Sequence, residues 1–166
     1  MRHTQNPILW RIKDQGLKHP ARTAVAAAVS LMVARAFKLP EAYWAPVSTI
    51  VVMQSTLGAA IKVSGQRFAG TALGAVAGGL IGTYFGPNAV VFGVSVFAMG
   101  LVCAVLWLDR AAYRFAGITL AIILLVAHEH SAWIVALHRF VEVSIGIAIG
   151  LLITAVWPER NAPQSA

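Results

Sequence analysis

Residues 68–108 decide the fold: FAGTALGAVAGGLIGTYFGPNAVVFGVSVFAMGLVCAVLWL contains no charged side chain over 41 positions. A membrane-spanning helix needs about 20 mostly apolar residues, so this run is too long for one span and long enough for two. Gly86, Pro87 and Asn88 stand in its middle, and these residue types are typical of a turn. The sequence therefore predicts helices over residues 67–85 and 88–108, joined by a tight turn.

The composition of the whole chain agrees with a membrane protein. Of its 166 residues, 58% are hydrophobic and only 11% are charged, and the mean hydropathy is +0.74. An ordinary soluble protein is about 25% charged, so this chain lacks the residues to cover a soluble globular surface. Intrinsic disorder is excluded because too much apolar surface would stay in water, and a disulfide scaffold is excluded because Cys103 stands alone.

Four more apolar segments bring the predicted spans to six: residues 20–37, 42–61, 113–127 and 132–157. The second is expected to end near Leu57 at Gly58, and the last at Pro158. The first has an alternative interpretation as a secretory signal ending at residues 34–36. The predicted fold class is thus an all-α integral membrane protein with six transmembrane helices over residues 20–158. Residues 1–19 form a basic cytoplasmic or interfacial segment, in which 7–19 are either an amphipathic helix or a disordered tail, and 159–166 form a cytoplasmic tail.

The basic residues predict the orientation. The formal net charge is +7, and ten of the thirteen Lys and Arg residues fall on one side of the six-span topology. Because such residues favour the cytoplasmic side, both termini are expected in the cytoplasm, as for a multi-pass protein of a bacterial-type inner membrane. The high positive charge is then explained by the membrane topology. The expected partner is therefore the lipid bilayer, and binding to nucleic acid is not expected. Arg139, inside the sixth predicted span, is the one cation that this rule does not place.

The two halves of the chain resemble each other. Arg67 and Phe68 recur as Arg139 and Phe140, 72 positions later, and in both cases a glycine follows at the seventh position after Arg. Each half would hold three spans, so the halves would cross the membrane in opposite senses. Such inverted three-helix repeats are a common plan of secondary transporters. The alternative is chance similarity between two apolar segments.

Glycines at four-residue spacing predict close helix packing. Small residues at this spacing let helix backbones approach each other in a membrane. The pattern does not distinguish a contact within one chain from a seam between subunits, and a homo-oligomer, with a dimer favoured, is expected. The predicted helix-packing residues are Gly70, Gly74, Gly78, Gly82, Gly146 and Gly150.

Arg139 and Glu142 are three residues apart and so share one face of a helix. Ionisable side chains within a membrane are costly and are commonly functional. A guanidinium matches a carboxylate with two parallel hydrogen bonds, so Arg139 is a candidate ligand for an anionic substrate. Glu142 would be its resting ion-pair partner or a proton carrier, assisted by His138, which titrates near neutral pH. The alternative is a structural ion pair.

The second predicted span offers further candidates for substrate binding. Tyr43 and Trp44 are interpreted either as an aromatic belt at the membrane surface or as the lining of a path for a flat aromatic acid. Gln54 is polar at depth and is interpreted as a lining residue. No catalytic residue, cofactor site or metal site is predicted, since His128, Glu129 and His130 are better explained as a solvated turn than as an incomplete metal site.

Several motifs together resemble the fusaric acid resistance and aromatic acid exporter family. They are Tyr-Trp-Ala-Pro at 43–46, Val-Met-Gln-Ser-Thr-Leu-Gly at 52–58, Gln-Arg-Phe-Ala-Gly-Thr-Ala-Leu-Gly at 66–74, Arg-Phe-x-Glu at 139–142 and Trp-Pro-Glu-Arg at 157–160. The resemblance covers about residues 19–160. It implies a six-span block that exports aromatic or other organic carboxylates. Together with the residues above, this leads us to expect a secondary exporter or exchanger, with proton coupling as one form of it, in which Arg139 and Arg67 attract the anion and Glu142 responds to protons.

Two alternative functions stay open at this point: a passive anion channel and a membrane scaffold or accessory subunit without transport of its own. Larger members of the family typically join two six-span blocks with cytosolic domains, and some work beside a periplasmic adaptor protein. This sequence holds one block, which implies a homo-oligomer and puts a periplasmic adaptor in doubt.

Overall fold

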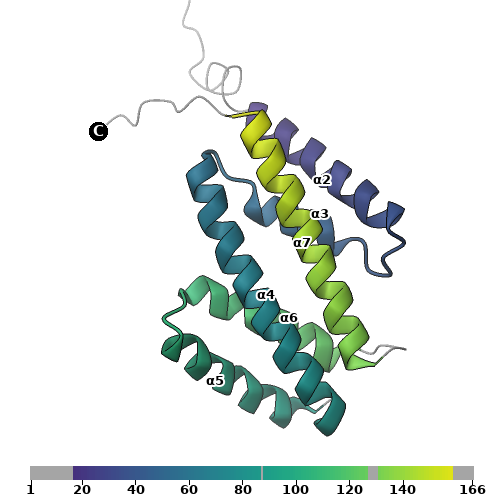
Figure 1. The fold of residues 1–166 in the computed structure, drawn as a ribbon, viewed down its shortest axis with the longest axis vertical. Coiled ribbons are helices and arrows are strands. Elements are labelled where there is room, and N and C mark those ends of the chain that lie inside the picture. The colour runs from purple at the N-terminus through teal and green to yellow at the C-terminus, as the bar shows by residue number, and fades with distance from the viewer. Residues whose placement is uncertain (1–16, 87, 127–130, 159–166) are drawn as a thin grey trace, which may run out of the picture.

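The computed structural model describes residues 17–86, 88–126 and 131–158, and in these ranges it contains helices and no strand. Figure 1 shows how the helices are arranged. In chain order they are α2 (Lys18–Ala36), α3 (Trp44–Val52), α4 (Leu57–Phe85), α5 (Ala89–Val105), α6 (Arg110–Leu125) and α7 (Ala132–Val156).

Two helices in the described ranges, α4 and α7, are both long enough and apolar enough to cross a membrane by length and composition. α5 is also apolar, but it has only 17 residues. The prediction of an all-helical fold is therefore confirmed, and four of the six predicted segments match α2, α5, α6 and α7 to within a few residues.

The prediction for residues 42–61 is wrong. α3 has nine residues and ends at Val52, and the backbone turns extended at Met53. Thr56 then begins a new helix, because its side-chain oxygen accepts a hydrogen bond from the backbone N–H of Ala59, as an N-cap residue does. Gly58, expected to end a span, lies in the first turn of α4. Pro46 falls in the first turn of α3, where its missing N–H has no helical partner to lose.

Because α4 begins at Leu57, it starts ten residues before the predicted helix at 67–85. Lys62 and Arg67 were assigned to a loop, and the structure places both on this helix. Lys62 is exposed, whereas Arg67 is only 5% exposed. The second of these cations is thus inside the protein and does not mark a membrane surface.

The helices pair across the two halves of the chain. The middle helix of the first half, α3, packs on α7, and the middle helix of the second half, α6, packs on α4. The first helix of each half lies beside its own middle helix, α2 on α3 and α5 on α6. This exchange of middle helices is the arrangement that an inverted repeat with a two-fold pseudo-axis produces.

The six glycines that the sequence singled out lie at contacts within this chain. A Cβ atom added to Gly74 would lie 2.5 Å from the carbonyl oxygen of Ala116, and one added to Gly146 would overlap the carbonyl oxygen of Ala45. Gly70 and Gly78 also face α6, Gly82 faces Ala132, and Gly150 faces Val52. The glycine faces of α4 and α7 are therefore covered by α6 and α3, so they provide no argument for a contact between subunits.

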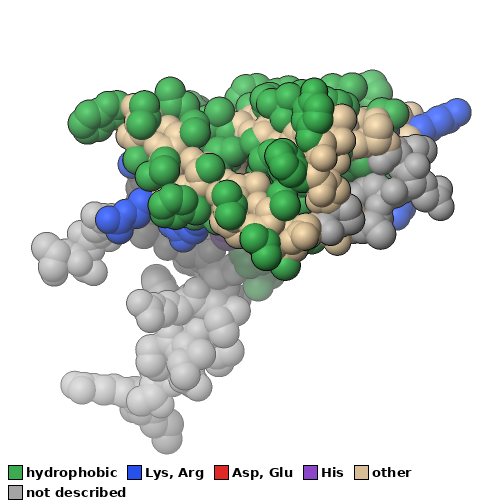
Figure 2. Space-filling view, turned by 90° about the horizontal axis from the view of Figure 1, so that it is seen from below, with side chains coloured by type: hydrophobic (Ala, Val, Ile, Leu, Met, Phe, Trp, Pro, Cys, Tyr) green, Lys and Arg blue, Asp and Glu red, His purple; other side chains and the backbone are tan. Residues whose placement is uncertain are grey.

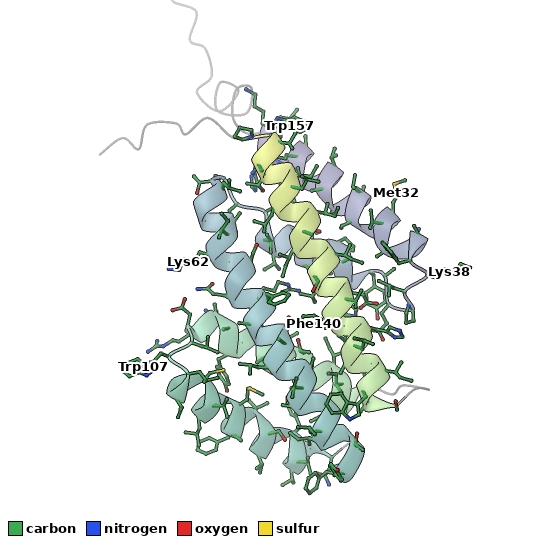
Figure 3. The ribbon with its side chains drawn as sticks, in the orientation of Figure 1. Met32, Lys38, Lys62, Trp107, Phe140 and Trp157 are labelled. Carbon is green, nitrogen blue, oxygen red and sulfur yellow. The ribbon has the colours of Figure 1, made fainter. Side chains whose placement is uncertain are left out.

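The helix ends fall into two groups (Figure 1). The start of α2, the break between α3 and α4, the turn between α5 and α6, and the end of α7 lie along the top and the left side of the view, and the other described helix ends lie along the right side and the bottom. Lys62 and Lys38 project at these opposite edges (Figure 3). Figure 2 shows a surface dominated by apolar side chains, with Lys and Arg at its margins.

Candidate functional site

A polar cluster lies between the two halves of the chain, and Arg139 is at its centre. Arg139 stands in the second turn of α7 and is 1% exposed. Its guanidinium carbon lies 3.7 Å from the centre of the Trp44 ring, a cation–π contact across the α3–α7 interface. The two neighbouring aromatic residues therefore have different environments. Trp44 faces the cluster, whereas Tyr43 is exposed, although their ring centres are only 5.4 Å apart.

Glu142 lies one turn beyond Arg139 on the same face of α7 and is fully buried. Its Oε1 accepts a hydrogen bond of 3.1 Å from the backbone N–H of Glu41. The carboxylate of Glu41 in turn accepts a 2.9 Å bond from the indole N–H of Trp44. The other oxygen of Glu142 is 3.9 Å from Nη1 of Arg139, which is an ion pair but too long for a hydrogen bond.

The second arginine, Arg67, belongs to α4. Its Nη2 donates a 3.0 Å hydrogen bond to the hydroxyl of Ser48 on α3. Its guanidinium carbon lies 4.9 Å from the centre of the Phe115 ring on α6. Arg67 is also close enough to Arg139 for the two cations to repel each other.

The two arginine environments correspond at the offset at which the two halves of the sequence resemble each other. Arg67 and Arg139 are the residues that recur after 72 positions, and their aromatic partners, Trp44 and Phe115, are 71 positions apart. Phe68 and Phe140, the residues after the arginines, meet with ring centres 5.0 Å apart. The interface between the halves thus carries two equivalent arginine–aromatic pairs beside one contact between equivalent phenylalanines.

Both arginines keep donors that no atom of the described residues accepts. Buried atoms without a hydrogen-bond partner include Nε of Arg67, Nε and Nη1 of Arg139, and Oε2 of Glu142. A buried polar atom without a partner costs about 1–3 kcal/mol, and more when it is charged. The two guanidinium groups, which lie among α3, α4, α6 and α7, thus offer the positive charge and the free N–H donors that binding of an anion requires.

The symmetry is broken at Glu142. Its repeat equivalent, 72 positions earlier, is Gly70, which packs against the backbone of Ala112. Ala112 in turn is 71 positions after Glu41, the residue whose N–H binds Glu142. At this position the first half therefore has a glycine in contact with a neighbouring helix, and the second half has a carboxylate. Among the residues that the structure describes, the Arg139 half alone brings a negative charge to its arginine.

An apolar groove of about 270 Å³ lies between α4 and α7 next to the phenylalanine contact. Ala72 and Val76 form its α4 side, and Trp133, Leu137 and Phe140 form its α7 side. Phe140 stands in the middle of the molecule in Figure 3, so it links this groove to the arginine that precedes it in the chain. For comparison, a cavity of about 150 Å³ holds a benzene ring.

Two predicted site residues lie apart from the core of this cluster or at its edge. Gln54 is in the break between α3 and α4, and its side-chain amide donates a 3.4 Å hydrogen bond to the carbonyl of Val51. His138 is half-buried on α7. The turn with His128, Glu129 and His130 lies outside the described residues. Within the residues that are described, no group of His, Cys, Asp and Glu side chains could hold a metal ion.

Arg22 is a functional candidate that the sequence did not single out, because it was counted among the topology-setting cations. It is 0% exposed, and its guanidinium donates to the carbonyl oxygens of Gln54, at 2.6 Å, and Trp157, at 2.8 Å. The start of α2, the α3–α4 break and the end of α7 are thereby tied together. Glu41 and Phe115 were also missed, and the similarity between the halves could have revealed Phe115 as the counterpart of Trp44.

Comparisons with known proteins agree with the fold and the motifs. The family described as fusaric acid resistance protein-like matches residues 26–153. The chain is 31% identical over 155 residues to the uncharacterized transporter YdhK of Escherichia coli K12, covering 87% of this chain and 23% of that protein. It is 29% identical over 146 residues to the inner membrane protein YeeA of the same organism, covering 86% of this chain and 41% of that protein. No solved structure matches the chain.

The chain therefore belongs to the fusaric acid resistance protein-like family, as the motifs predicted. It spans less than half the length of the two relatives. The matched region contains both arginine–aromatic pairs, Glu142 and the glycine faces.

Proposed function

We propose that the chain is a membrane transporter that exports organic carboxylate anions, aromatic ones in particular, and that Arg67 and Arg139 bind the anion. The observation that carries this proposal is the pair of buried arginines whose N–H groups have no acceptor among the described residues. A carboxylate satisfies such donors with charge-assisted hydrogen bonds. The names of the relatives, a transporter and an inner membrane protein, support the coarser part of this proposal, which is transport across a membrane.

The surroundings of the arginines favour an aromatic acid. Trp44 and Phe115 cover one side of the two guanidinium groups, and the apolar groove beside Phe140 has room for a substituted ring. Binding sites for small molecules typically combine such apolar walls with a few polar groups that fix the orientation. The carboxylate would then lie at the arginines and the ring against the apolar side chains.

Glu142 is proposed as the group that couples transport to protons. While ionised, its carboxylate competes with the substrate for Arg139, from which it is 3.9 Å away. A proton on Glu142 removes this competition and leaves Arg139 to the anion. Binding of a proton and of the substrate would thus favour each other, so the two would cross together, and net export would require an outward anion gradient larger than the inward proton gradient. His138, on the same helix, is proposed as a relay.

We further propose the six-span topology in an inner membrane, with both termini on the cytoplasmic side. The two groups of helix ends support it, since helix ends that the basic residues assign to the cytoplasm lie together. α3 has nine residues, about 14 Å of helix, so it would cross only together with the extended segment after it. The working unit is proposed to be a homo-oligomer, with a dimer favoured, and its subunit contact would have to lie outside the glycine faces that α3 and α6 cover.

The decisive experiment measures uptake of radiolabelled benzoate into proteoliposomes that contain the purified protein. Arg67→Gln and Arg139→Gln should each lower the rate about tenfold or more, because each removes charge-assisted hydrogen bonds worth about 1.5–3 kcal/mol. Lys62→Gln is the matched control, since Lys62 is an exposed cation on the same helix as Arg67. Uptake that neither arginine substitution changes would contradict the proposed site.

The same proteoliposomes distinguish the alternative functions. A proton-coupled carrier responds to an imposed pH gradient, and Glu142→Gln should abolish this response while exchange of benzoate continues. A passive channel would instead give currents in planar bilayers that reverse at the equilibrium potential of the anion. An accessory subunit would show neither a response to the pH gradient nor a current. In such a protein we would also expect a hydrogen bond between Arg139 and Glu142, whose facing atoms here have none.

A further inference from the structure

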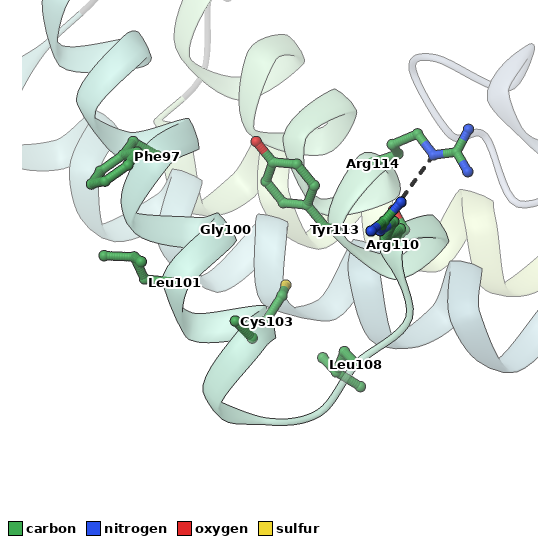
Figure 4. Close-up of a pocket in the computed structure, with 9 residues that line it drawn as sticks. Phe97, Gly100, Leu101, Cys103, Leu108, Arg110, Tyr113 and Arg114 are labelled. Carbon is green, nitrogen blue, oxygen red and sulfur yellow. Dashed lines mark hydrogen bonds between the residues drawn. The ribbon is translucent and has the colours of Figure 1, made fainter.

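A second groove opens on the other side of the molecule, between α5 and α6, away from the arginine–aromatic pairs. Its volume is about 690 Å³. Phe97, Leu101 and Leu108 supply apolar walls, and Arg110 and Arg114 stand at its edge. In Figure 4 the two arginines lie on the α6 side and Phe97 and Leu101 on the opposite α5 side.

The groove exists because α5 has few helix neighbours. Its repeat equivalent, α2, packs on both α3 and α7, whereas α5 packs on α6 and touches α4 only slightly. Gly100 brings the backbone of α5 close to Tyr113, since a Cβ added there would be 3.4 Å from the ring. The Tyr113 ring thus lines the groove where α5 comes close to α6.

The two arginines give this apolar groove a charged end. Arg110 and Arg114 are both exposed and are one helical turn apart in α6. The described part of the chain supplies one hydrogen bond to them, from Nε of Arg114 to the carbonyl of Arg110 at 3.4 Å. The nearby carboxylate of Asp109 accepts a hydrogen bond from Gln66 on α4. Both guanidinium groups therefore keep donors directed to the surroundings.

We propose that this groove binds an anionic phospholipid, with an acyl chain along Phe97 and Leu101 and the phosphate at Arg110 and Arg114. Basic residues at one end of an apolar groove between membrane helices match a lipid headgroup and its chain together. Trp107, in the same turn and 94% exposed, suits the level of the headgroups. A second copy of the chain fits less well, because a symmetric contact would place the same arginines opposite each other.

This inference relies on the membrane location in the proposed function, and it does not rely on transport. The test is native mass spectrometry of the detergent-purified protein, titrated with phosphatidylglycerol or with phosphatidylcholine of the same chain length. Phosphatidylglycerol should bind more tightly, and the double variant Arg110→Gln/Arg114→Gln should weaken it on the order of tenfold while phosphatidylcholine is unaffected. Arg35→Gln/Lys38→Gln is the matched control, because it removes the same charge from exposed positions in and just after the last turn of α2.

Two further arms separate the headgroup from the chain. Ala104→Phe places a ring in the groove and should weaken phosphatidylglycerol binding without changing the charge. Glycerol phosphate, which has the headgroup chemistry and no chain, should fail to displace the lipid. Equal binding of the two lipids, an effect of the control variant as large as that of the arginine variant, or displacement by glycerol phosphate would each overturn the proposal. All readouts are binding measurements, so failure here leaves the transport proposal standing.

Discussion

Arg67 and Arg139 have the same kind of aromatic neighbour and different electrostatic surroundings. Arg67 donates to the neutral hydroxyl of Ser48, whereas Arg139 faces the carboxylate of Glu142. Because a neutral partner competes with a substrate anion less than a carboxylate does, Arg67 should make the larger contribution to anion binding in the resting protein. Arg139 should contribute as much as Arg67 to anion binding only when Glu142 is protonated or displaced.

Glu142→Gln is expected to tighten the binding of benzoate. The substitution removes the negative charge beside Arg139 and keeps a side chain of the same shape, so the anion meets less repulsion. A gain of about tenfold in affinity, equivalent to about 1.4 kcal/mol, should be measurable by isothermal titration calorimetry of the detergent-purified protein at pH 7. Asp109→Asn, at an exposed carboxylate, should leave the affinity unchanged. Weaker binding by the Glu142 variant would contradict this arrangement.

At the scale of the helices, close backbone contacts carry the pairing of the halves. Gly74 on α4 meets Ala116 and Thr119 of α6, and Gly146 on α7 meets Ala45 and Ser48 of α3. Glycine is needed at both positions because even one methyl group would overlap the neighbouring backbone. Gly65, on α4, has nothing within 4 Å of an added Cβ.

Gly74→Ala and Gly146→Ala should both destabilise the protein, by about 1–3 kcal/mol each, because the added methyl forces the helices apart. Gly65→Ala should instead be neutral or stabilising by up to about 1 kcal/mol, since alanine restricts the unfolded chain and nothing opposes its methyl group. Thermal unfolding of the three variants in detergent, followed by circular dichroism, measures the difference. Equal unfolding temperatures for Gly65→Ala and Gly74→Ala would argue against the α4–α6 contact.

Arg22 holds three helix ends through main-chain carbonyls, so its loss should loosen them together. Arg22→Gln shortens the side chain and removes the charge, and a hydrogen bond to a charged group contributes about 1.5–3 kcal/mol. Hydrogen–deuterium exchange should rise around residues 18–22, 52–56 and 154–157, and the unfolding temperature should fall. Arg35→Gln, at an exposed position in the last turn of the same helix, should change both much less. Exchange that rises in only one of the three segments would show that they are not tied through Arg22.

At the scale of the whole molecule, the two groups of helix ends predict which residues each side of a membrane can reach. In a Cys103→Ser background, a cysteine at Lys38 should react in intact cells with a maleimide that cannot cross the membrane. A cysteine at Lys62 should react only after the cells are opened, because the two residues project at opposite edges of the molecule (Figure 3). Labelling of both cysteines in intact cells would contradict the proposed orientation.

Periodicity and composition were enough to predict the helices that are long, apolar and flanked by turn residues, as for α5 and α7. They failed around residues 53–57, where the side-chain oxygen of Thr56 accepts the hydrogen bond that caps the start of α4, whereas Gly58 in the sequence is typical of a helix end. A charge-free segment looked continuous there, although the backbone is not. For the same reason the sequence predicts Lys62 and Arg67 in a loop, whereas both residues lie on α4.

The candidate site was partly predictable for the same kind of reason. Arg139 and Glu142 stand out because a charge within an apolar helix is conspicuous in a sequence. The burial of Arg22 could not be seen, since its acceptors are backbone carbonyls 32 and 135 residues away that any sequence would offer. The pairing of each arginine with an aromatic residue depends on the exchange of middle helices, which is a property of the fold and not of either segment.

The exchange of middle helices also has a consequence for how the protein is made. Neither half can form its packed interior alone. The glycine face of α4 is covered by α6 of the second half, and that of α7 is covered by α3 of the first half. A ribosome releases the first three helices long before the last three, so α4 must wait in the bilayer with its glycine face uncovered. We therefore expect the nascent chain to be most accessible to proteases and insertion chaperones between synthesis of Phe85 and synthesis of Leu125.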